Sequence, residues 1–570
     1  MLVAPAVSEW VLHPRRDPDR ALGLARALGS PVAVAHALVN RGVDTEEAAR
    51  RFLSPDLDDL HDPMGLRDLD RAVERVAQAV WRGERILVHG DYDVDGITST
   101  FVLYAVLAEL GGRVEYHIPH RTRDGYGLSD SAIELARRRG CTLIVTVDCG
   151  ITAVAAVERA SAAGIDTVIT DHHAPLDTLP AACAVVNPLR PGCGYPFKSL
   201  AGVGVTFKLA QALLRGRGGL ERAREFLDVV ALGTIADVVP LTGENRVLAR
   251  YGLDRLGATT RPGIKALMEV AGMSGRRITS SEVAFVLAPR INAAGRMGNA
   301  EQSLRLLLAR DAPEARACAE SLEEDNRRRR EFDERALVQA IERVESETDW
   351  PRCASIVLWS EDWHPGVIGI VASRLVERYQ RPTVLVALDG ERGRGSGRSL
   401  PGLDLNRVLS RCTDLLEAWG GHALAAGLTV RRERLPELRA RIESLVEEEL
   451  APGDKAPRLT VDADVSLREC GLETVDWLER LSPHGLDNAA PLFRASGLVV
   501  ESATAVGGGK HLRATLRDAT GRAEAIGFGL GSLAPELART PRCDAVFVPD
   551  RNEWQGETRA QLKLKGVRVA

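Results

Sequence analysis

Three aspartates and a histidine crowd together just after a short apolar run. The segment ILVHGDYDVDG (86–96) contains His89, Asp91, Asp93 and Asp95 within seven residues. Carboxylates this close raise one another's pKa and destabilise a fold unless something neutralises them. A divalent cation is the usual neutralising group. The spacing therefore predicts a metal site, provided that the rest of the chain supplies further ligands.

Further candidate ligands follow other apolar runs. Asp148 ends CTLIVTVD, His172 and His173 follow Asp171 in TDHH, and Asp237 lies in ALGTIADVVPL, where a bare carboxylate would be costly to bury. One such aspartate alone is usually a helix N-cap, and one such histidine a surface residue. Carboxylates and imidazoles without thiolates favour Mn²⁺ or Mg²⁺. Together the ligands suffice for two ions that share a carboxylate, an arrangement suited to phosphoryl transfer.

Strands and helices must alternate to position these side chains. Short apolar runs lie at 85–90, 113–119, 141–150, 166–173 and 184–188, and helical stretches such as TSTFVLYAVLAELG separate several of them. This alternation predicts βαβ units and an α/β fold with a doubly wound parallel sheet. Ligands of such sheets bind beyond the carboxyl ends of the strands, which is where the candidate ligands lie.

The rest of the chain divides by composition. Its 570 residues suggest three or four domains. The glycine-rich segments GRGSGRS (393–399) and WGGHALAAG (419–427) are predicted to be loops, and APGDKAP (451–457) a linker. We expect a polar, helical N-terminal extension (1–70), a catalytic α/β domain (71–270), a helical connector with a long charged helix (271–350), a second α/β domain (351–450) and a small β-barrel (451–570).

Composition excludes several classes of protein. The net charge of −5 gives no global attraction to nucleic acid, so binding DNA would need a local basic groove. Nine cysteines without a CxxC pair indicate neither a zinc knuckle nor a disulfide framework. The N-terminus has no targeting pattern and no stretch approaches the ~18 apolar residues of a membrane span. We expect a cytoplasmic protein with no membrane partner.

The order of the motifs resembles a known family. HGDYDVDG, VDCG, DHH and GTIADVVPL resemble the motifs of the DHH phosphoesterase superfamily, and GGHALAAG resembles the glycine-rich motif of its DHHA1 domain. DGYGLS, APRINAAGRMGNA, SGRS and the terminal NEWQGETRAQLKLKGVRV look like the RecJ family of bacterial single-strand-specific 5′→3′ exonucleases. The resemblance covers most of residues 70–570. It implies a DHH domain, a DHHA1 domain and an OB-like barrel.

The resemblance also implies roles for individual residues. His89, Asp93 and Asp148 match ligands of one ion, and Asp95, Asp148, His172 and Asp237 match ligands of the other, with Asp148 as the bridge. His173 matches the residue that contacts the scissile phosphate or the leaving group. Asp91 is expected to orient a ligand without binding an ion itself.

Substrate contacts are expected in three other segments. The resemblance implies that Ser396, Arg398, Ser399, Gly420, Gly421 and His422 bind substrate phosphates. Arg290, Asn292 and Arg296 look like phosphate contacts, the alternative being an N-cap and a solvated face. Tyr126 either stacks on a base or anchors a turn.

The leading prediction is a metal-dependent exonuclease that degrades single-stranded DNA from the 5′ end to 5′-mononucleotides in recombination and repair. The resemblance suggests single-strand-binding protein and a RecQ-type helicase as collaborators, and we expect a monomer. The alternatives are a DHH phosphodiesterase of short oligonucleotides or cyclic dinucleotides, a manganese pyrophosphatase, and a single-strand-binding scaffold without turnover. The barrel and the RINAAGR segment disfavour the two small-substrate enzymes. The intact ligand set disfavours the scaffold.

Overall fold

The computed structural model describes residues 9–121, 123–449, 458–540, 542–554 and 556–569. The predicted linker at 451–457 lies outside these residues. The chain forms two compact units, one built mainly from Trp10–Glu320 and Leu459–Ala570, the other from Ser321–Arg458. Each unit is described by itself.

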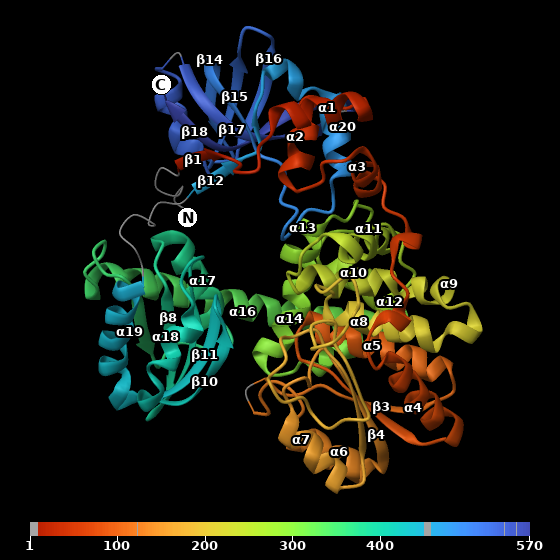
Figure 1. Ribbon diagram of the computed structural model, residues 1–570. Helices are drawn as coiled ribbons and strands as arrows, with labels where there is room; N and C mark the ends of the chain where they lie inside the picture. The colour runs from red at the N-terminus through yellow and green to blue at the C-terminus, as the bar shows by residue number, and fades with distance from the viewer. Residues whose placement is uncertain (1–8, 122, 450–457, 541, 555, 570) are drawn as a thin grey trace. The chain divides into compact units, whose positions relative to one another are not determined.

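The first unit contains the predicted doubly wound sheet (Figure 1). Its strands run parallel in the order β3-β2-β4-β5-β6. They are β2 Arg85–His89, β3 Arg113–His117, β4 Cys141–Val147, β5 Asp166–Thr170 and β6 Ala184–Val186. The order reverses between β2 and β4, because the chain goes from β2 outward to β3 and then back past β2 to β4. Such a switch point leaves a crevice beyond the strand ends where ligands bind.

Helices cover both faces of this sheet. On one face α6 (Asp130–Arg139) and α7 (Val154–Ala162) pack their alanines, isoleucine and valine against Leu87, Ile144 and Ile169. On the other face lie α5 (Val94–Glu109) and α8 (Gly202–Leu213), and α10 (Leu227–Ala236) packs on both of these helices. Helix α5 is buried along most of its length, as a helix between two layers must be. The remaining helices of this part are α4 Leu69–Arg82, α9 Leu220–Ala223, α11 Gly243–Gly257, α12 Pro262–Val270, α13 Ser280–Glu282, a π-helical turn Val283–Leu287, α14 Ala288–Met297 and α15 Glu301–Leu308.

The C-terminal strands form the predicted barrel. They run in the order β14-β15-β16-β18-β17, and pairing of β14 with β17 closes the sheet. Closure removes the exposed edges that an open sheet would leave. The elements are β13 Ala463–Asp464, α20 Leu472–Arg480, β14 Phe493–Val506, β15 His511–Arg517, β16 Arg522–Gly527, α21 Ala534–Leu537, β17 Arg542–Trp554 and β18 Glu557–Val569.

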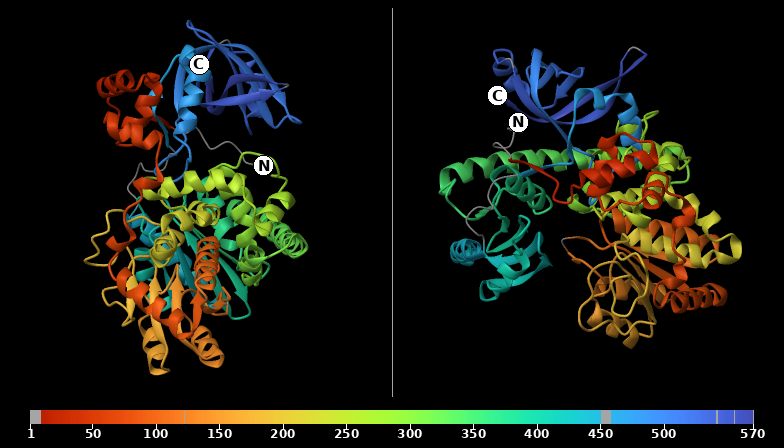
Figure 2. Two further views of the ribbon diagram at one scale, coloured as in Figure 1. Left: turned by 90° about the vertical axis from the view of Figure 1, so that its right-hand side faces the viewer. Right: turned by 45° about the horizontal axis from the view of Figure 1, so that its top comes forward.

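The N-terminal helices lie beside the C-terminal region of the chain (Figure 2) and share the core of this barrel. They are α1 (Pro18–Leu28), α2 (Val32–Asn40) and α3 (Glu46–Leu53), and β1 (Glu9–Leu12) pairs with β12 (Arg458–Val461). The predicted polar character does not hold for α2, whose sequence VAVAHALVN is buried at every position except Val32. A helix buried on almost every side is stable only where other elements cover it.

Among the described residues no single helix has the length and apolar character to cross a membrane, although the bent pair α1 and α2, at 118° to each other, satisfies both criteria when taken together.

The second unit holds a mixed sheet in the order β10-β11-β9-β8-β7. The long helix α16 (Ala312–Glu347) confirms the predicted connecting helix. The other elements are β7 Ile356–Ser360, α17 Ile368–Tyr379, β8 Thr383–Asp389, β9 Arg392–Arg398, α18 Leu405–Ser410, β10 Leu416–His422, β11 Ala425–Arg431 and α19 Leu435–Glu449.

The two predicted glycine-rich loops are strands, so that prediction was wrong. GRGSGR forms β9, and WGGHALAAG forms most of the β10–β11 hairpin. The glycines serve close packing rather than flexibility: a Cβ at Gly393 would lie 2.4 Å from Val386, and one at Gly397 2.6 Å from Leu405. Glycine is poor in strands unless a neighbour approaches this closely.

Candidate metal centre and phosphate-binding residues

The ends of three neighbouring strands bring the predicted ligands together. β2 ends at His89, and Asp93 caps the following helix by accepting from Gly96 N at 3.1 Å. β4 pairs with β2 and leads into Asp148, whose φ of 61° is in the left-handed region. β5 pairs with β4 and leads into Asp171, His172 and His173. The switch point of the sheet is therefore lined with carboxylates and imidazoles.

Three overlapping triads could each hold an ion. In each triad the ligand atoms lie within 4.8 Å of one another. The triads are Asp91–Asp93–Asp148, Asp95–His172–Asp237 and Asp148–His172–His173. Because Asp148 and His172 each belong to two triads, the cluster is continuous and has room for more than one ligand set.

Helices α8 and α10 complete the cluster. Asp95 accepts hydrogen bonds from Gly202 N at 2.6 Å and Val203 N at 2.8 Å, at the positive end of α8. A Cβ at Gly202 would lie 2.4 Å from Asp148 Oδ1, so only glycine lets the helix approach both carboxylates. Asp237 is the residue that ends α10.

The cluster is electrostatically strained without a cation. Burial, together with the charge of Asp93, raises the pKa of Asp95 to about 7. Burial and the neighbouring carboxylates also raise the pKa values of Asp91, Asp148 and Asp237 well above the ordinary value. A bound divalent cation reverses this balance by stabilising the ionised carboxylates.

The donor atoms fit such a cation. Asp91 Oδ1, Asp148 Oδ1 and Asp237 Oδ2 are buried and accept no hydrogen bond from the described residues. Asp148 Oδ1 lies only 3.1 Å from His172 Nε2. Two ligands at right angles on an ion with bonds of about 2.1 Å lie about 3.0 Å apart. Buried, unsatisfied oxygens at ligand spacing, with oxygen and imidazole donors, suit Mn²⁺ or Mg²⁺.

A buried aspartate orients His173. Asp171 Oδ1 accepts from the backbone N–H groups of His172 (2.7 Å) and His173 (3.0 Å) and lies 2.8 Å from His173 Nδ1, while Oδ2 accepts from Ile151 N at 2.9 Å. Burial by itself lowers the pKa of His173, but the hydrogen bond to Asp171 and the nearby carboxylates outweigh it and the pKa is raised. Nδ1–H therefore points to Asp171 and leaves Nε2 for other partners.

Tyr126 also contacts His173. Its hydroxyl lies 2.9 Å from His173 Nδ1 and 3.3 Å from the carbonyl oxygen of Asp148, and the two rings meet edge to face at 5.4 Å. These contacts join Tyr126 to the candidate metal centre, while 47% of the residue is exposed, so the base platform and the turn anchor both stay predictions.

His89 is turned toward other partners. Its Nδ1 lies 3.0 Å from His117 Nδ1, and its Nε2 lies 3.2 Å from the carbonyl oxygen of Gly127. Burial lowers the pKa of His89 to about 3, so the ring is neutral. The structure does not bring His89 into any of the three triads. It does bring in Asp91, which we expected only to orient a ligand.

The predicted phosphate contacts fall into two groups. In the first unit Arg290, Asn292 and Arg296 lie on α14, where Arg290 is buried and donates to the Val286 carbonyl at 2.7 Å. A Cβ at Gly295 would lie 2.8 Å from the carbonyl oxygen of Tyr92, so α14 packs directly on the GDYDVDG loop. This helix supports the loop that carries the predicted metal ligands.

The second group lies on one sheet of the second unit. Ser396 and Arg398 are on β9, Gly420, Gly421 and His422 are on β10, and β11 lies between them. Arg398 Nη1 donates to Ser396 Oγ at 3.0 Å, and Ser399 Oγ donates to the Leu403 carbonyl at 2.9 Å. A Cβ at Gly369 would lie 2.8 Å from both Ser396 Oγ and Arg398 Nη2, so the start of α17 abuts this pair. A guanidinium, a hydroxyl and a helix N-terminus together suit a phosphate.

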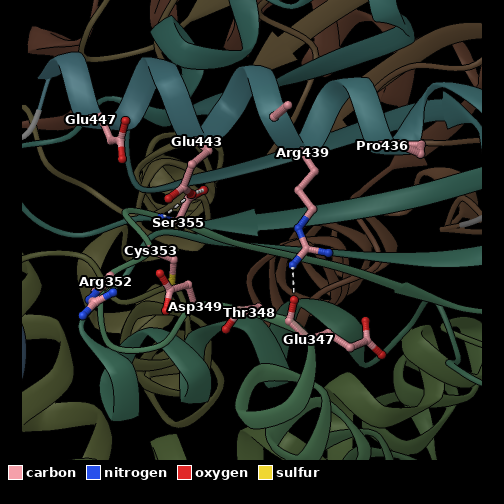
Figure 3. A pocket seen from close by; sticks show the side chains of 11 residues that line it. Glu347, Thr348, Asp349, Arg352, Cys353, Ser355, Pro436, Arg439, Glu443 and Glu447 are labelled. Atoms are coloured by element: carbon pink, nitrogen blue, oxygen red, sulfur yellow. Dashed lines mark hydrogen bonds between the residues drawn. The ribbon is translucent and has the colours of Figure 1, made fainter.

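The second unit also contains a pocket that is separate from these predicted phosphate contacts. It lies between α19 and the segment after α16 (Figure 3). There Glu443 accepts from Ala354 N and Ser355 N, and Arg439 donates to the Glu347 carbonyl at 3.1 Å. The Ser355 hydroxyl also donates to Glu443, so the side chains of Ser355, Arg439 and Glu443 have partners within the pocket.

The sequence prediction assigned no role to two residues of the centre. Asp171 was noted as the residue before the two histidines, after an apolar run, but not as the partner that orients His173. Nothing in the local sequence distinguishes Gly202, because its role depends on how closely α8 approaches Asp148.

Comparison with known families agrees with the fold. Residues 85–234 match the DHH family N-terminal domain, residues 352–448 the DHHA1 domain and residues 461–566 the RecJ OB domain.

Similar proteins cover almost the whole chain. The single-stranded-DNA-specific exonuclease RecJ of Bacillus subtilis is 39% identical over 98% of this chain and 71% of its own length. The corresponding protein of Escherichia coli is 35% identical over 97% of this chain and 98% of its own. The crystal structure of RecJ from Thermus thermophilus in complex with Mn²⁺ superposes with a TM-score of 0.85 at 33% identity, covering 99% of this chain and 80% of that one.

Proposed function

This chain belongs to the RecJ family of single-stranded-DNA-specific exonucleases, and on that premise we propose that it degrades single-stranded DNA from the 5′ end to 5′-mononucleotides during DNA recombination and repair. The main support is the cluster of three overlapping triads at the switch point of the sheet. RecJ of Thermus thermophilus has been crystallised with Mn²⁺ and with Mg²⁺, and oxygen and imidazole donors suit both ions.

Two divalent ions would share the cluster. Asp91, Asp93 and Asp148 are proposed to hold one ion, and Asp95, His172 and Asp237 the other, with Asp148 close to both. Ions bound there would supply Lewis-acid chemistry, lowering the pKa of a water molecule and neutralising charge on the phosphate. His89 stays a predicted ligand. Its Nε2 lies 3.2 Å from the Gly127 carbonyl oxygen, and it would have to leave this oxygen to bind an ion.

His173 is the proposed general acid. The cleaved bond joins phosphorus to the 3′ oxygen of the departing nucleotide, and that oxygen needs a proton as it leaves. His173 is suited to donate it from Nε2, because Asp171 holds Nδ1–H and the raised pKa keeps the ring charged closer to neutral pH. The Asp171–His173 pair would thus fix both the orientation and the charge of the acid.

The phosphate contacts are proposed for the DNA backbone. Ser396, Arg398 and the Gly420–His422 strand would bind phosphates that are not being cleaved, through a guanidinium, hydroxyls and backbone N–H groups. Such contacts carry no base information and suit an enzyme that accepts any sequence. Arg296 and Asn292 are proposed as further contacts, and Arg290 as a structural residue because of its burial.

End-labelled DNA tests the proposal. With Mn²⁺ and a single strand labelled at its 5′ end, the label should leave at once as a mononucleotide, while the same strand labelled at its 3′ end should shorten gradually. Blunt duplex DNA and samples with EDTA serve as controls and should stay intact. Rapid cleavage of dinucleotides with no release from long strands would instead support the small-substrate phosphodiesterase.

The cellular setting is a further part of the proposal. We expect a monomer in the cytoplasm that works with single-strand-binding protein and a RecQ-type helicase, because a single-strand nuclease needs a partner that unwinds duplex DNA. Co-purification of either protein with the tagged chain, lost after nuclease treatment if DNA alone bridges them, would test this.

A further inference from the structure

Val238 follows Asp237 directly and has an unfavourable backbone conformation. Helix α10 ends at Ala236 with Asp237 as its cap, and the φ of Val238 is 59°. Left-handed backbone is unfavourable for an L-residue, most of all for a β-branched one, and glycine is the usual residue just after a helix cap. Among the described non-glycine residues with positive φ, Val238 is the only β-branched one; the others are Asp68, Asp148, Gln380 and Asp487.

Packing does not explain the valine. Val238 is 66% exposed, whereas Ile235 and Leu241 on either side of it are buried. A glycine would satisfy the same backbone without strain, and the exposed valine side chain gains no packing in return. The valine therefore lowers stability through its backbone, and residues kept in such conformations cluster at functional sites.

The chain around Val238 is fixed at both ends. Asp237 belongs to a triad of the metal centre, and its Oδ2 lies 3.5 Å from His172 Nε2. On the other side Leu241 N donates to the carbonyl of Leu486 at 2.9 Å. Leu486 is itself 48% exposed, so a second apolar side chain stands on the segment bonded to this one. The short span between Asp237 and Leu241 cannot relax without moving Asp237.

We propose that Val238 packs against the sugar and base of the nucleotide whose phosphate is bound at the metal centre. This inference rests on the proposed function. Beside its phosphate group, a nucleotide presents two apolar surfaces: the edge of the deoxyribose and the face of the base. An aliphatic contact with these surfaces is independent of sequence, as an exonuclease acting on any strand requires. Val238 would thus position the nucleotide at the bond to be cleaved, while Asp237 would bind an ion.

Three variants separate the effect of the Val238 side chain from the effect of the backbone strain. Val238→Gly removes both, and Val238→Ala keeps the strain but shortens the side chain. Gln380→Gly is the matched control, because Gln380 has a φ of 53° at the end of α17 in the other unit. Thermal stability, Mn²⁺ affinity, KM and kcat on a 5′-labelled single strand are measured for each protein.

We expect both glycine variants to be at least as stable as the wild type, because each removes left-handed strain. Val238→Gly should raise KM about tenfold, the effect of withdrawing a valine-sized apolar contact, with kcat and Mn²⁺ affinity within about twofold of wild type. Val238→Ala should show a smaller rise in KM, and Gln380→Gly none.

An unchanged KM in Val238→Gly overturns the proposed contact between Val238 and the nucleotide. So does a fall in Mn²⁺ affinity that accounts for the whole loss of activity, because Val238 would then act only on Asp237. A wild-type protein that leaves the single strand intact would overturn the proposed function, and this inference with it.

Discussion

Replacing Asp171 by asparagine tests the proposed acid directly. The buried carboxylate accepts from three backbone N–H groups and from His173 Nδ1. An amide of the same shape has one accepting oxygen in place of two and carries no charge. Whichever way it is oriented, at least one of these donors faces an NH₂ group and is left unpaired.

The magnitude follows from the bond to His173. A hydrogen bond to a charged group contributes about 1.5–3 kcal/mol. Asp171 makes this bond most strongly to the protonated ring, so Asp171→Asn should lower the pKa of His173 and destabilise the acid form. At neutral pH kcat should fall about 10- to 100-fold, since each 1.4 kcal/mol or so is a factor of ten. The unpaired N–H should cost a further 1–3 kcal/mol or so of folding stability.

The assay is initial-rate release of a 5′ label from single-stranded DNA, from about pH 6 to about pH 9. Activity of the variant should decline at a lower pH than that of the wild type, because its His173 loses its proton earlier. Asp177→Asn is the matched control, since Asp177 is exposed on the segment that follows the DHH triplet. A folded Asp171→Asn protein with kcat within about threefold of wild type and an unchanged pH profile would refute the assignment of His173 as the acid.

Three further outcomes follow from the site. Asp148→Ala should abolish hydrolysis while gel-shift binding of single-stranded DNA persists; retained turnover would contradict a shared ligand. Tyr126→Phe keeps the ring against His173 and loses the contacts of the hydroxyl with His173 Nδ1 and the Asp148 carbonyl, so kcat should fall about 2- to 10-fold at constant KM, whereas a rise in KM would favour base stacking. Metal-stripped protein should lose stability as the pH rises through the pKa of about 7 of Asp95, because a raised folded pKa means that the folded state binds more protons than the unfolded state. Thermal melts in EDTA should show this decline and Mn²⁺ should remove it; a flat profile would contradict the buried-carboxylate cluster.

The sequence by itself determined the chemistry of the centre. Residue type and order are local properties, so the acidic and imidazole groups of HGDYDVDG, the aspartate after the third strand run, DHH and the aspartate of GTIADVVPL were identifiable as candidate ligands. The last of these, Asp237, ends a helix and not a strand. Alternation of apolar runs with helical stretches predicted the parallel sheet, and a parallel sheet brings its carboxyl ends to one edge. The confirmed barrel and long helix rested on equally local patterns.

Only the tertiary structure decided which groups meet. His89 belongs to the same short motif as Asp93, yet its ring lies against His117, at the end of β3, and the carbonyl of Gly127. Gly202 is required because a distant helix abuts Asp148, and the glycines of β9 are strand residues because Val386 and Leu405 leave no room for a side chain. Helix α2 is buried because the C-terminal barrel covers it. The hydrogen bond between Asn40 and Asp462 joins residues more than 400 positions apart in the chain. Each of these facts depends on atoms brought close by folding, and sequence spacing does not encode that distance.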